Sequence, residues 1–272
     1  MRHLQAHHIT DVYCVVDDLV SEPPKPKGGR PPALSQSEVV TILIWNTLTV
    51  KQQTLKDLYA WVDRYHRLDF PALPPYNRFV DHCHRALPVL LMLLQQTLAS
   101  DAPLKFVDST MLEVCRLVRA DRHKICKNIA QFGKNHQGWH YGFKLHAAID
   151  LHGKLGGLFF TPASFHDAQA MPAILNHHTK IAVGDSAYGA RVMGRHLFET
   201  YGTIVVAPPH YTQKRKILTW WQYKLLTLRP KIESVFGYLK QQLHLVTSFP
   251  RSINGYLLHY VRILLGYQFL VG

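Results

Sequence analysis

The spacing of apolar residues changes once along this chain, close to Pro103. Before that point, apolar side chains recur at the intervals of amphipathic helices. After it, short apolar or alternating runs typical of strands take turns with helical stretches. Strands that alternate with helices favour a mixed α/β sheet with helices on its faces. The pattern therefore predicts a helical N-terminal region over residues 1–100 and an α/β domain over residues 101–272.

The first part is expected to be helical throughout. Its predicted helices cover residues 4–20, a stretch from Ser35 to Leu48, residues 55–65, and residues 77–98 with a break near Pro88. Ser35 followed by Glu38 forms a capping-box pattern at the start of the second helix. Residues 21–33 are rich in proline and basic residues, which predicts an irregular linker or arm.

The second part alternates between the two patterns. Strands are expected over residues 104–107, 139–150, 155–161, 180–184 and 203–207. Helices are expected over residues 166–175, 190–201, 221–243 with a break at Pro230, and 256–270, the last packing on the sheet. Residues 113–138 are predicted to form an irregular basic loop.

The charge of the chain indicates a polyanionic partner. The formal net charge is +13, and residues 200–272 carry nine basic side chains but one acidic side chain, Glu233. A basic surface around a single acid favours nucleic acid over an anionic membrane. No apolar run is long enough for a membrane span or a secretory signal, and the four cysteines form no disulfide pattern, so we expect a reduced cytosolic protein.

Two apolar strands each lead into an aspartate. They are Phe106-Val107-Asp108 and Ala182-Val183-Gly184-Asp185. If these strands are neighbours, both carboxylates project from one edge of the sheet, and Glu233 lies on a helix that can cross that edge. Clustered carboxylates repel one another unless a cation lies between them, and Mg²⁺ prefers oxygen ligands. Two such ions, roughly 3.5–4 Å apart, would suit an in-line phosphoryl displacement.

Basic residues flank Glu233 at helical spacing. Arg229 precedes it by four residues and Lys240 follows by seven, so all three can share one helix face. They would then bind phosphates beside the metals, although a solvated stripe with an intrahelical ion pair is an equally good interpretation.

These residues resemble the catalytic core of bacterial insertion-sequence DDE transposases, closest to the insertion-sequence nine-eight-two family. The resemblance spans about residues 29–245. It rests on Gly29-Arg-Pro-Pro-Ala-Leu-Ser-Gln-Ser-Glu38, Tyr76-Asn-Arg-Phe79, Asp108-Ser-Thr-Met-Leu-Glu-Val-Cys115, Tyr141-Gly-Phe-Lys-Leu-His146, Ser164-Phe-His-Asp167 and Gly184-Asp-Ser-Ala-Tyr188, together with the helix that carries Arg229, Glu233 and Lys240.

The resemblance implies a ribonuclease-H-like fold with Asp108, Asp185 and Glu233 as a catalytic, metal-binding triad. The implied activity is endonucleolytic hydrolysis at transposon ends, followed by attack of the freed 3′-hydroxyl on target DNA. The implied cofactors are two Mg²⁺ ions, with Mn²⁺ as a substitute. The implied partners are double-stranded DNA with terminal inverted repeats and target DNA, bound by a homodimer or larger assembly in the bacterial cytoplasm, at the nucleoid.

Several other residues admit more than one role. Lys124, Lys127, Lys134 and Lys144 are candidates for DNA backbone contacts. Asp167 is expected to cap a helix, and Glu113 to form a loop ion pair. A zinc site at Cys115, His123 and Cys126 is disfavoured, because only three ligands are visible.

The aromatic residues and the N-terminal helices also leave alternatives open. Trp139, Trp220, Trp221 and Tyr223 are expected in the core, with base stacking as the alternative. The helices of residues 35–98 either read DNA, with Arg78 and Arg85 facing it, or serve dimerisation. For the whole chain, the alternatives to a transposase are a non-catalytic nucleic-acid-binding protein, such as a decayed transposase, and a structure-specific nuclease.

Overall fold

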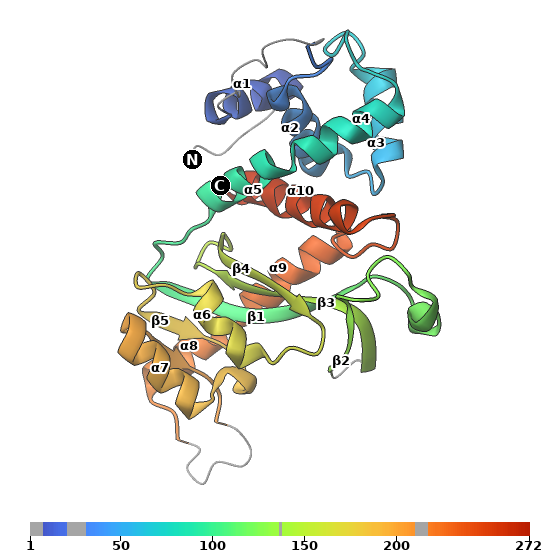
Figure 1. Ribbon diagram of the computed structural model, residues 1–272. Helices are drawn as coiled ribbons and strands as arrows, with labels where there is room; N and C mark the ends of the chain where they lie inside the picture. The colour runs from blue at the N-terminus through green and yellow to red at the C-terminus, as the bar shows by residue number, and fades with distance from the viewer. Residues whose placement is uncertain (1–7, 21–30, 136–137, 210–216) are drawn as a thin grey trace. The chain divides into compact units, whose positions relative to one another are not determined.

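The computed structural model describes residues 8–20, 31–135, 138–209 and 217–272 (Figure 1). The chain forms two compact units. The helical unit comprises Met1–Thr97, Gln241–Leu245 and Phe249–Gly272, and the sheet unit comprises Leu98–Lys240 and Val246–Ser248. The start of the first expected helix and most of the expected basic linker, including Gly29 and Arg30, lie outside the described residues.

The helical unit follows the predicted pattern closely. It contains α1 (Ile9–Leu19), α2 (Gln36–Trp45), the π-helical turn η1 (Asn46–Val50), α3 (Leu55–Tyr65), α4 (Tyr76–Arg85), α5 (Leu87–Thr97) and α10 (Ile253–Val271). The capping box is confirmed: Ser35 Oγ accepts from the Glu38 N–H at 3.1 Å, and Glu38 Oε2 accepts from the Ser35 N–H at 2.7 Å. The expected break occurs at Ala86, and Pro88 lies in the first turn of α5, where its missing N–H costs nothing.

Helix α10 packs within the helical unit, against α2, η1, α4 and α5. The sequence places this helix in a domain of residues 101–272, whereas the structure groups it with the helical unit. Its side chains are buried almost continuously from Tyr256 to Phe269, and Gln268 Nε2 donates to the carbonyl oxygen of Thr97 at 2.7 Å. A helix that is apolar on every side carries no signal for which surface it covers, so its place could not be deduced from its own sequence.

In the part of the chain that the structure describes, the sheet unit contains six strands. They are β1 (Leu104–Glu113), β2 (Gln131–Asn135), β3 (Gly138–Ile149), β4 (Leu155–Pro162), β5 (Ile181–Val183) and β6 (Ile204–Val206). β3 runs antiparallel to β1, β2 and β4, while β5 runs parallel to β1 and β6. The path through the sheet is β2-β3-β1-β5-β6, with β4 also paired to β3. The prediction of a mixed α/β sheet is confirmed, and this arrangement is compatible with a ribonuclease-H-like domain.

The helices of this unit lie between its strands and after the last of them. They are η2 (Leu117–Arg122), η3 (Asp167–Ala170), α6 (Met171–Ile174), η4 (Ser186–Tyr188), α7 (Arg191–Tyr201), α8 (Trp220–Thr227) and α9 (Pro230–Gln241). Pro230 begins α9, so the expected long helix over residues 221–243 is two helices. The segment expected as a helix over 166–175 is a 3₁₀ turn followed by one short helix.

Two strands differ from the prediction. β1 does not end before Asp108 but continues to Glu113, because β3 pairs with it from Phe106 to Glu113 and supplies partners for the polar segment. The expected irregular loop over 113–138 contains η2 and the strand β2, which pairs with β3. A five-residue strand rich in polar residues gives too few alternations to be detected by period.

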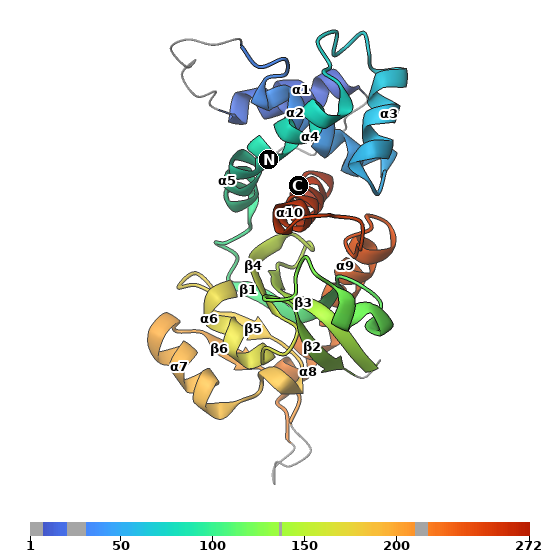
Figure 2. The same cartoon turned by 45° about the vertical axis from the view of Figure 1, so that its right-hand side comes forward.

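The two faces of the sheet carry different helices. Val107 of β1 packs in a buried core with Met171 and Ile174 of α6 and Leu197 of α7. Successive side chains of a strand point to opposite faces, so Asp108 points away from that core. Helix α9 lies on the other side of the sheet from α6 in both views (Figures 1 and 2), and Arg229, which precedes α9, contacts Asp108. Among the described residues, no helix is long and apolar enough to span a bilayer.

The packing of α10 within the helical unit can be tested at Gly266. A Cβ added there would lie 2.4 Å from the Cβ of Thr47, so Gly266→Ala should destabilise the protein by about 1–3 kcal/mol through overpacking. Gly194→Ala is the control, because nothing lies within 4 Å of its added Cβ and alanine favours a helix by up to about 1 kcal/mol. Thermal unfolding followed by circular dichroism measures both. A melting temperature of Gly266→Ala equal to that of the wild type would contradict this packing.

Candidate active site

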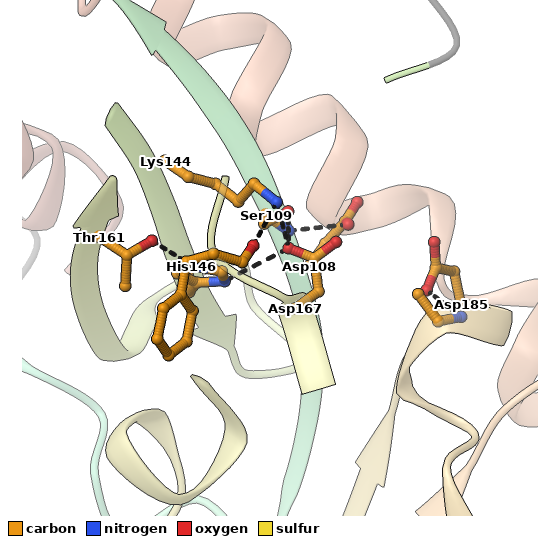
Figure 3. A network of polar contacts seen from close by, with 9 residues as sticks. Asp108, Ser109, Lys144, His146, Thr161, Asp167 and Asp185 are labelled. Atoms are coloured by element: carbon orange, nitrogen blue, oxygen red, sulfur yellow. Dashed lines mark hydrogen bonds and ion pairs between the residues drawn. The ribbon is translucent and has the colours of Figure 1, made fainter. Parts of the chain in front are cut away.

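Parallel pairing of β1 with β5 brings Asp108 and Asp185 to the same part of the sheet. Phe106 pairs with Val183, and each aspartate follows two residues later in the same strand direction. The chain leaves the sheet after β5, where Asp185 caps η4 and its Oδ1 accepts from the N–H of Ala187 at 2.9 Å. Asp108 lies within β1, and both carboxylates are seen in Figure 3. The predicted convergence of these two acids is therefore supported by the strand register.

Arg229 links the third acid to the first. It immediately precedes α9, and its Nη1 lies 3.0 Å from Glu233 Oε1. Its Nη2 lies 3.6 Å from Asp108 Oδ2. The side chains are 24% exposed for Arg229, 16% for Asp108 and 53% for Glu233. The expected shared face of Arg229 and Glu233 is confirmed, and one guanidinium connects carboxylates of β1 and α9.

Comparison with known proteins identifies the family of this chain. A family model described as a transposase DDE domain matches residues 99–253, which is more than half of the chain. The chain belongs to the DDE transposase family. The match includes Asp108, Asp185 and Glu233. No curated protein and no solved structure matches the chain, and membership of the nine-eight-two family stays a prediction. Transposases act on DNA, and members of this family generally use divalent metal ions.

Burial dominates the electrostatics of Asp108 in this transposase. It raises the pKa of Asp108 from 3.8 to about 6, and the carboxylates of Asp185 and Asp167 push in the same direction. A hydrogen bond from the N–H of Ser109 at 2.8 Å and the charge of Arg229 oppose the rise without cancelling it. The ionised carboxylate is thus short of positive partners, and a further cation beside it would stabilise it.

The donor set at this edge fits a hard divalent cation. Asp108, Asp185 and Glu233 offer carboxylate oxygens, the ligands that Mg²⁺ prefers. Within residues 8–20, 31–135, 138–209 and 217–272, no three His, Cys, Asp or Glu side chains are close enough together to hold one ion. The guanidinium of Arg229 contacts both Asp108 and Glu233 and offsets part of their combined negative charge. A metal shared by these two acids would therefore displace that guanidinium.

The predicted phosphate-binding lysines fall into two groups. Lys124, Lys127 and Lys134 are exposed on the segment between β1 and β3, and Lys134 Nζ lies 5.7 Å from the ring centre of Trp139. Lys240 of α9 is partly buried, and burial lowers its pKa while the carboxylate of Glu113 opposes the fall. The exposed lysines therefore remain available to a polyanion.

Lys144 is not a surface residue. It is 7% exposed, and its Nζ donates to the carbonyl oxygen of Phe165 at 2.8 Å and to Asp167 Oδ1 at 3.0 Å. The prediction that Lys144 contacts the DNA backbone is therefore wrong for this fold. Asp167 also does not cap a helix, because it accepts from Ser109 Oγ at 2.8 Å instead. Its presence in the Ser164-Phe-His-Asp167 motif was the signal in the sequence for a role beyond capping.

The structure also describes the surroundings of Glu113 and of the four aromatic candidates. Glu113 ends β1 and pairs with His140 Nδ1 at 2.5 Å, so its expected ion pair joins two strands. The four aromatic residues expected in the core are instead exposed, by 57%, 75%, 42% and 58% for Trp139, Trp220, Trp221 and Tyr223. Core packing therefore does not account for these aromatic side chains.

The buried His146 gives this unit a pH dependence. Burial lowers the pKa of His146 from 6.5 to about 4, although Asp167 opposes the fall. The unfolded chain thus binds a proton between about pH 6.5 and 4 that the folded chain does not, so stability falls as the pH falls through this window. His146→Gln should reduce that loss by about 1–3 kcal/mol. Urea unfolding from pH 7 to pH 4.5 measures it, and parallel curves for wild type and variant would contradict the assignment.

Proposed function

We propose that this chain catalyses metal-dependent cleavage at transposon ends and strand transfer into target DNA. The proposal is supported by a matched transposase domain in which Asp108 and Asp185 follow neighbouring parallel strands. Asp108 and Asp185 are related by the parallel strand register, and Glu233 is connected to Asp108 through Arg229. The nine-eight-two assignment belongs to the same proposal.

We infer that Asp108, Asp185 and Glu233 hold the divalent ions, with Mg²⁺ as the natural metal and Mn²⁺ as a substitute. When bound, two such ions would neutralise charge on the phosphate and favour deprotonation of the attacking hydroxyl. The other contributions come from the chain itself. Burial keeps Asp108 in a fixed place on the sheet, while Arg229 presents planar N–H donors suited to phosphate oxygens. Lys240 lies further along the same helix and adds positive charge.

We assign DNA backbone contact to the exposed basic segment that precedes β3. Arg116, Arg119, Arg122, Lys124, Lys127 and Lys134 are exposed there. Asp121 is the single exposed acid between Arg116 and Lys134. A surface of this composition binds a phosphate backbone with little dependence on base sequence. The helical unit would contribute end recognition or dimerisation, with exposed Arg78 and Arg85 on α4 as the candidates.

Neutral, nearly isosteric replacements test the triad. Asp108→Asn, Asp185→Asn and Glu233→Gln should each reduce strand cleavage by at least about 10³-fold while DNA binding persists, because each removes a carboxylate and preserves its shape. Glu199→Gln on the exposed face of α7 is the matched control and should cleave normally. The measurement is cleavage and joining of a labelled terminal-repeat DNA with Mg²⁺ or Mn²⁺.

Three results would contradict this proposal. Cleavage without joining would indicate a structure-specific nuclease. Salt-sensitive DNA binding without cleavage under either metal would indicate a decayed, non-catalytic binding protein. Normal cleavage by the triad variants would place the chemistry elsewhere.

The basic segment makes a separate prediction about salt. Alanine at Lys124, Lys127 or Lys134 should weaken binding to all duplex sequences alike and reduce the slope of log affinity against log salt by roughly one for each lost phosphate contact. Lys180→Ala, an exposed lysine beside β5, is the control. Fluorescence anisotropy between low and physiological salt measures the slope, and an unchanged slope in all three variants would exclude this surface.

A further inference from the structure

A second polar cluster lies close to Asp108. At its centre is Asp167 of η3, whose Oδ1 accepts from Ser109 Oγ at 2.8 Å and from Lys144 Nζ at 3.0 Å (Figure 3). His146 Nδ1 lies 3.6 Å from the same oxygen, and His146 Nε2 is 2.9 Å from Thr161 Oγ1. The cluster thus joins residues from β1, β3, β4 and η3.

The strand register places this cluster on the sheet face opposite to the triad. Ser109 pairs with His146, and Met111 pairs with Lys144, so these side chains share one face. Asp108 precedes Ser109 in the same strand and therefore points to the other face. The register thus directs the Asp108 carboxylate and the side chains of the cluster to opposite faces of β1.

Burial makes the cluster costly unless it is fully paired. Lys144 is 7% exposed and His146 is fully buried, while the Asp167 side chain is 25% exposed. An isolated charge in such a place is strongly unfavourable, but the Lys144 ammonium and the Asp167 carboxylate neutralise each other. Lys144 also donates to the carbonyl oxygen of Phe165, which fixes the turn that carries Asp167. The sheet therefore maintains a paired Lys144–Asp167 contact on the face opposite to Asp108.

Ser109 connects the two faces. Its hydroxyl donates to Asp167 on one side, while its backbone N–H donates to Asp108 Oδ1 at 2.8 Å on the other. Fixing the Ser109 side chain fixes the peptide that carries this N–H. The orientation of the Asp108 carboxylate is thereby coupled to a salt bridge on the opposite face.

Tyr188 adds a contact from the Asp185 side. It is 1% exposed, and its ring packs so closely on Gly184 that a Cβ at that glycine would lie 2.9 Å from it. Burial raises the pKa of Tyr188, and the carboxylates of Asp167, Asp108 and Asp185 add to the rise. The phenol is thus a neutral group near all three aspartates, and it packs against the backbone just before Asp185.

We propose that Asp167, held by Lys144 and acting through Ser109, is a positioning residue that orients the Asp108 carboxylate for metal binding and DNA cleavage. The inference rests on the proposed function for the role of Asp108, but the coupling between the two faces of β1 stands on the contacts themselves. As a positioning residue, Asp167 would touch neither DNA nor metal.

Ser109→Ala provides the sharpest test, because it removes the connecting hydroxyl and leaves the Asp167–Lys144 pair intact. It should weaken Mn²⁺ affinity of the full chain by about 10-fold or more, as is usual when a hydrogen-bond partner of a metal ligand is lost. It should lower kcat for cleavage with little change in the KM for DNA. Ser109→Thr keeps a hydroxyl donor and should restore both values, and Asp167→Asn should behave like Ser109→Ala.

Thr161→Val is the matched control at the far end of the network. It removes the partner of His146 without touching Ser109, so it should alter stability but leave Mn²⁺ affinity within twofold. Isothermal titration with Mn²⁺ measures affinity, and circular dichroism verifies folding. If Asp167→Asn does not fold, Ser109→Ala decides alone. Folded Ser109→Ala protein with wild-type Mn²⁺ affinity and kcat would overturn the proposal.

Hydrogen exchange of the metal-free chain separates this proposal from the proposed function. A peptide covering residues 106–112 should exchange faster in Ser109→Ala and Asp167→Asn than in wild type or Thr161→Val. Wild-type protein that binds no Mn²⁺ but shows this difference would contradict the metal-dependent function and leave the coupling of the two faces intact. Unchanged exchange in the two variants would refute the coupling.

Discussion

The parallel pairing of β1 with β5 is the contact on which the acidic edge depends. It sets Phe106 opposite Val183 and thereby brings Asp108 and Asp185 to one region from positions far apart in the chain. β3 then pairs along β1 through and beyond Asp108, so the first acid lies on continuous sheet rather than on a loop. Acids held on strands keep their geometry better than acids on loops, which suits chemistry that depends on position.

Electrostatics explains the residues that surround this edge. Burial disfavours the charge on Asp108, and its aspartate neighbours add to that cost. Two cations on opposite faces of the sheet offset part of this cost. Arg229 bridges Asp108 and Glu233, and Lys144 neutralises Asp167. Neither pair needs to add net stability, since burying charges offsets much of their attraction. Their effect is to keep several carboxylates close together, and in the proposed function a divalent metal ion and a DNA phosphate would bind there.

Much of this arrangement could be predicted from the sequence, and the misses share a physical cause. Local signals such as the Ser35 capping box and the alternation from Trp139 to Asp150 describe elements that stabilise themselves, and they were confirmed. Three features depend on partners that are distant in sequence: the continuation of β1 past Asp108, the strand β2 and the packing of α10. The local spacing of apolar and polar residues therefore does not predict these features.

The side-chain contacts divide in the same way. Contacts within one element are predictable from the sequence, and contacts between distant elements are not. Arg229 and Glu233 lie four residues apart on one helix, so their contact was predictable from spacing alone. Lys144 on an alternating strand looks like a solvent-facing lysine until β1, β4 and the Asp167 turn are assembled around it. The local sequence predicts Asp167 as a helix cap. Its actual partners, Ser109 and Lys144, are 58 and 23 residues away and do not show in that local pattern.

Anomalous diffraction from crystals of the full chain grown with Mn²⁺ would show whether Asp108, Asp185 and Glu233 form one metal site. We expect anomalous density bound by Asp108 together with Asp185 or Glu233, and an Arg229 side chain moved out from between Asp108 and Glu233. Well-ordered Asp108, Asp185 and Glu233 side chains without anomalous density, and with Arg229 still bridging Asp108 and Glu233 at saturating Mn²⁺, would contradict it.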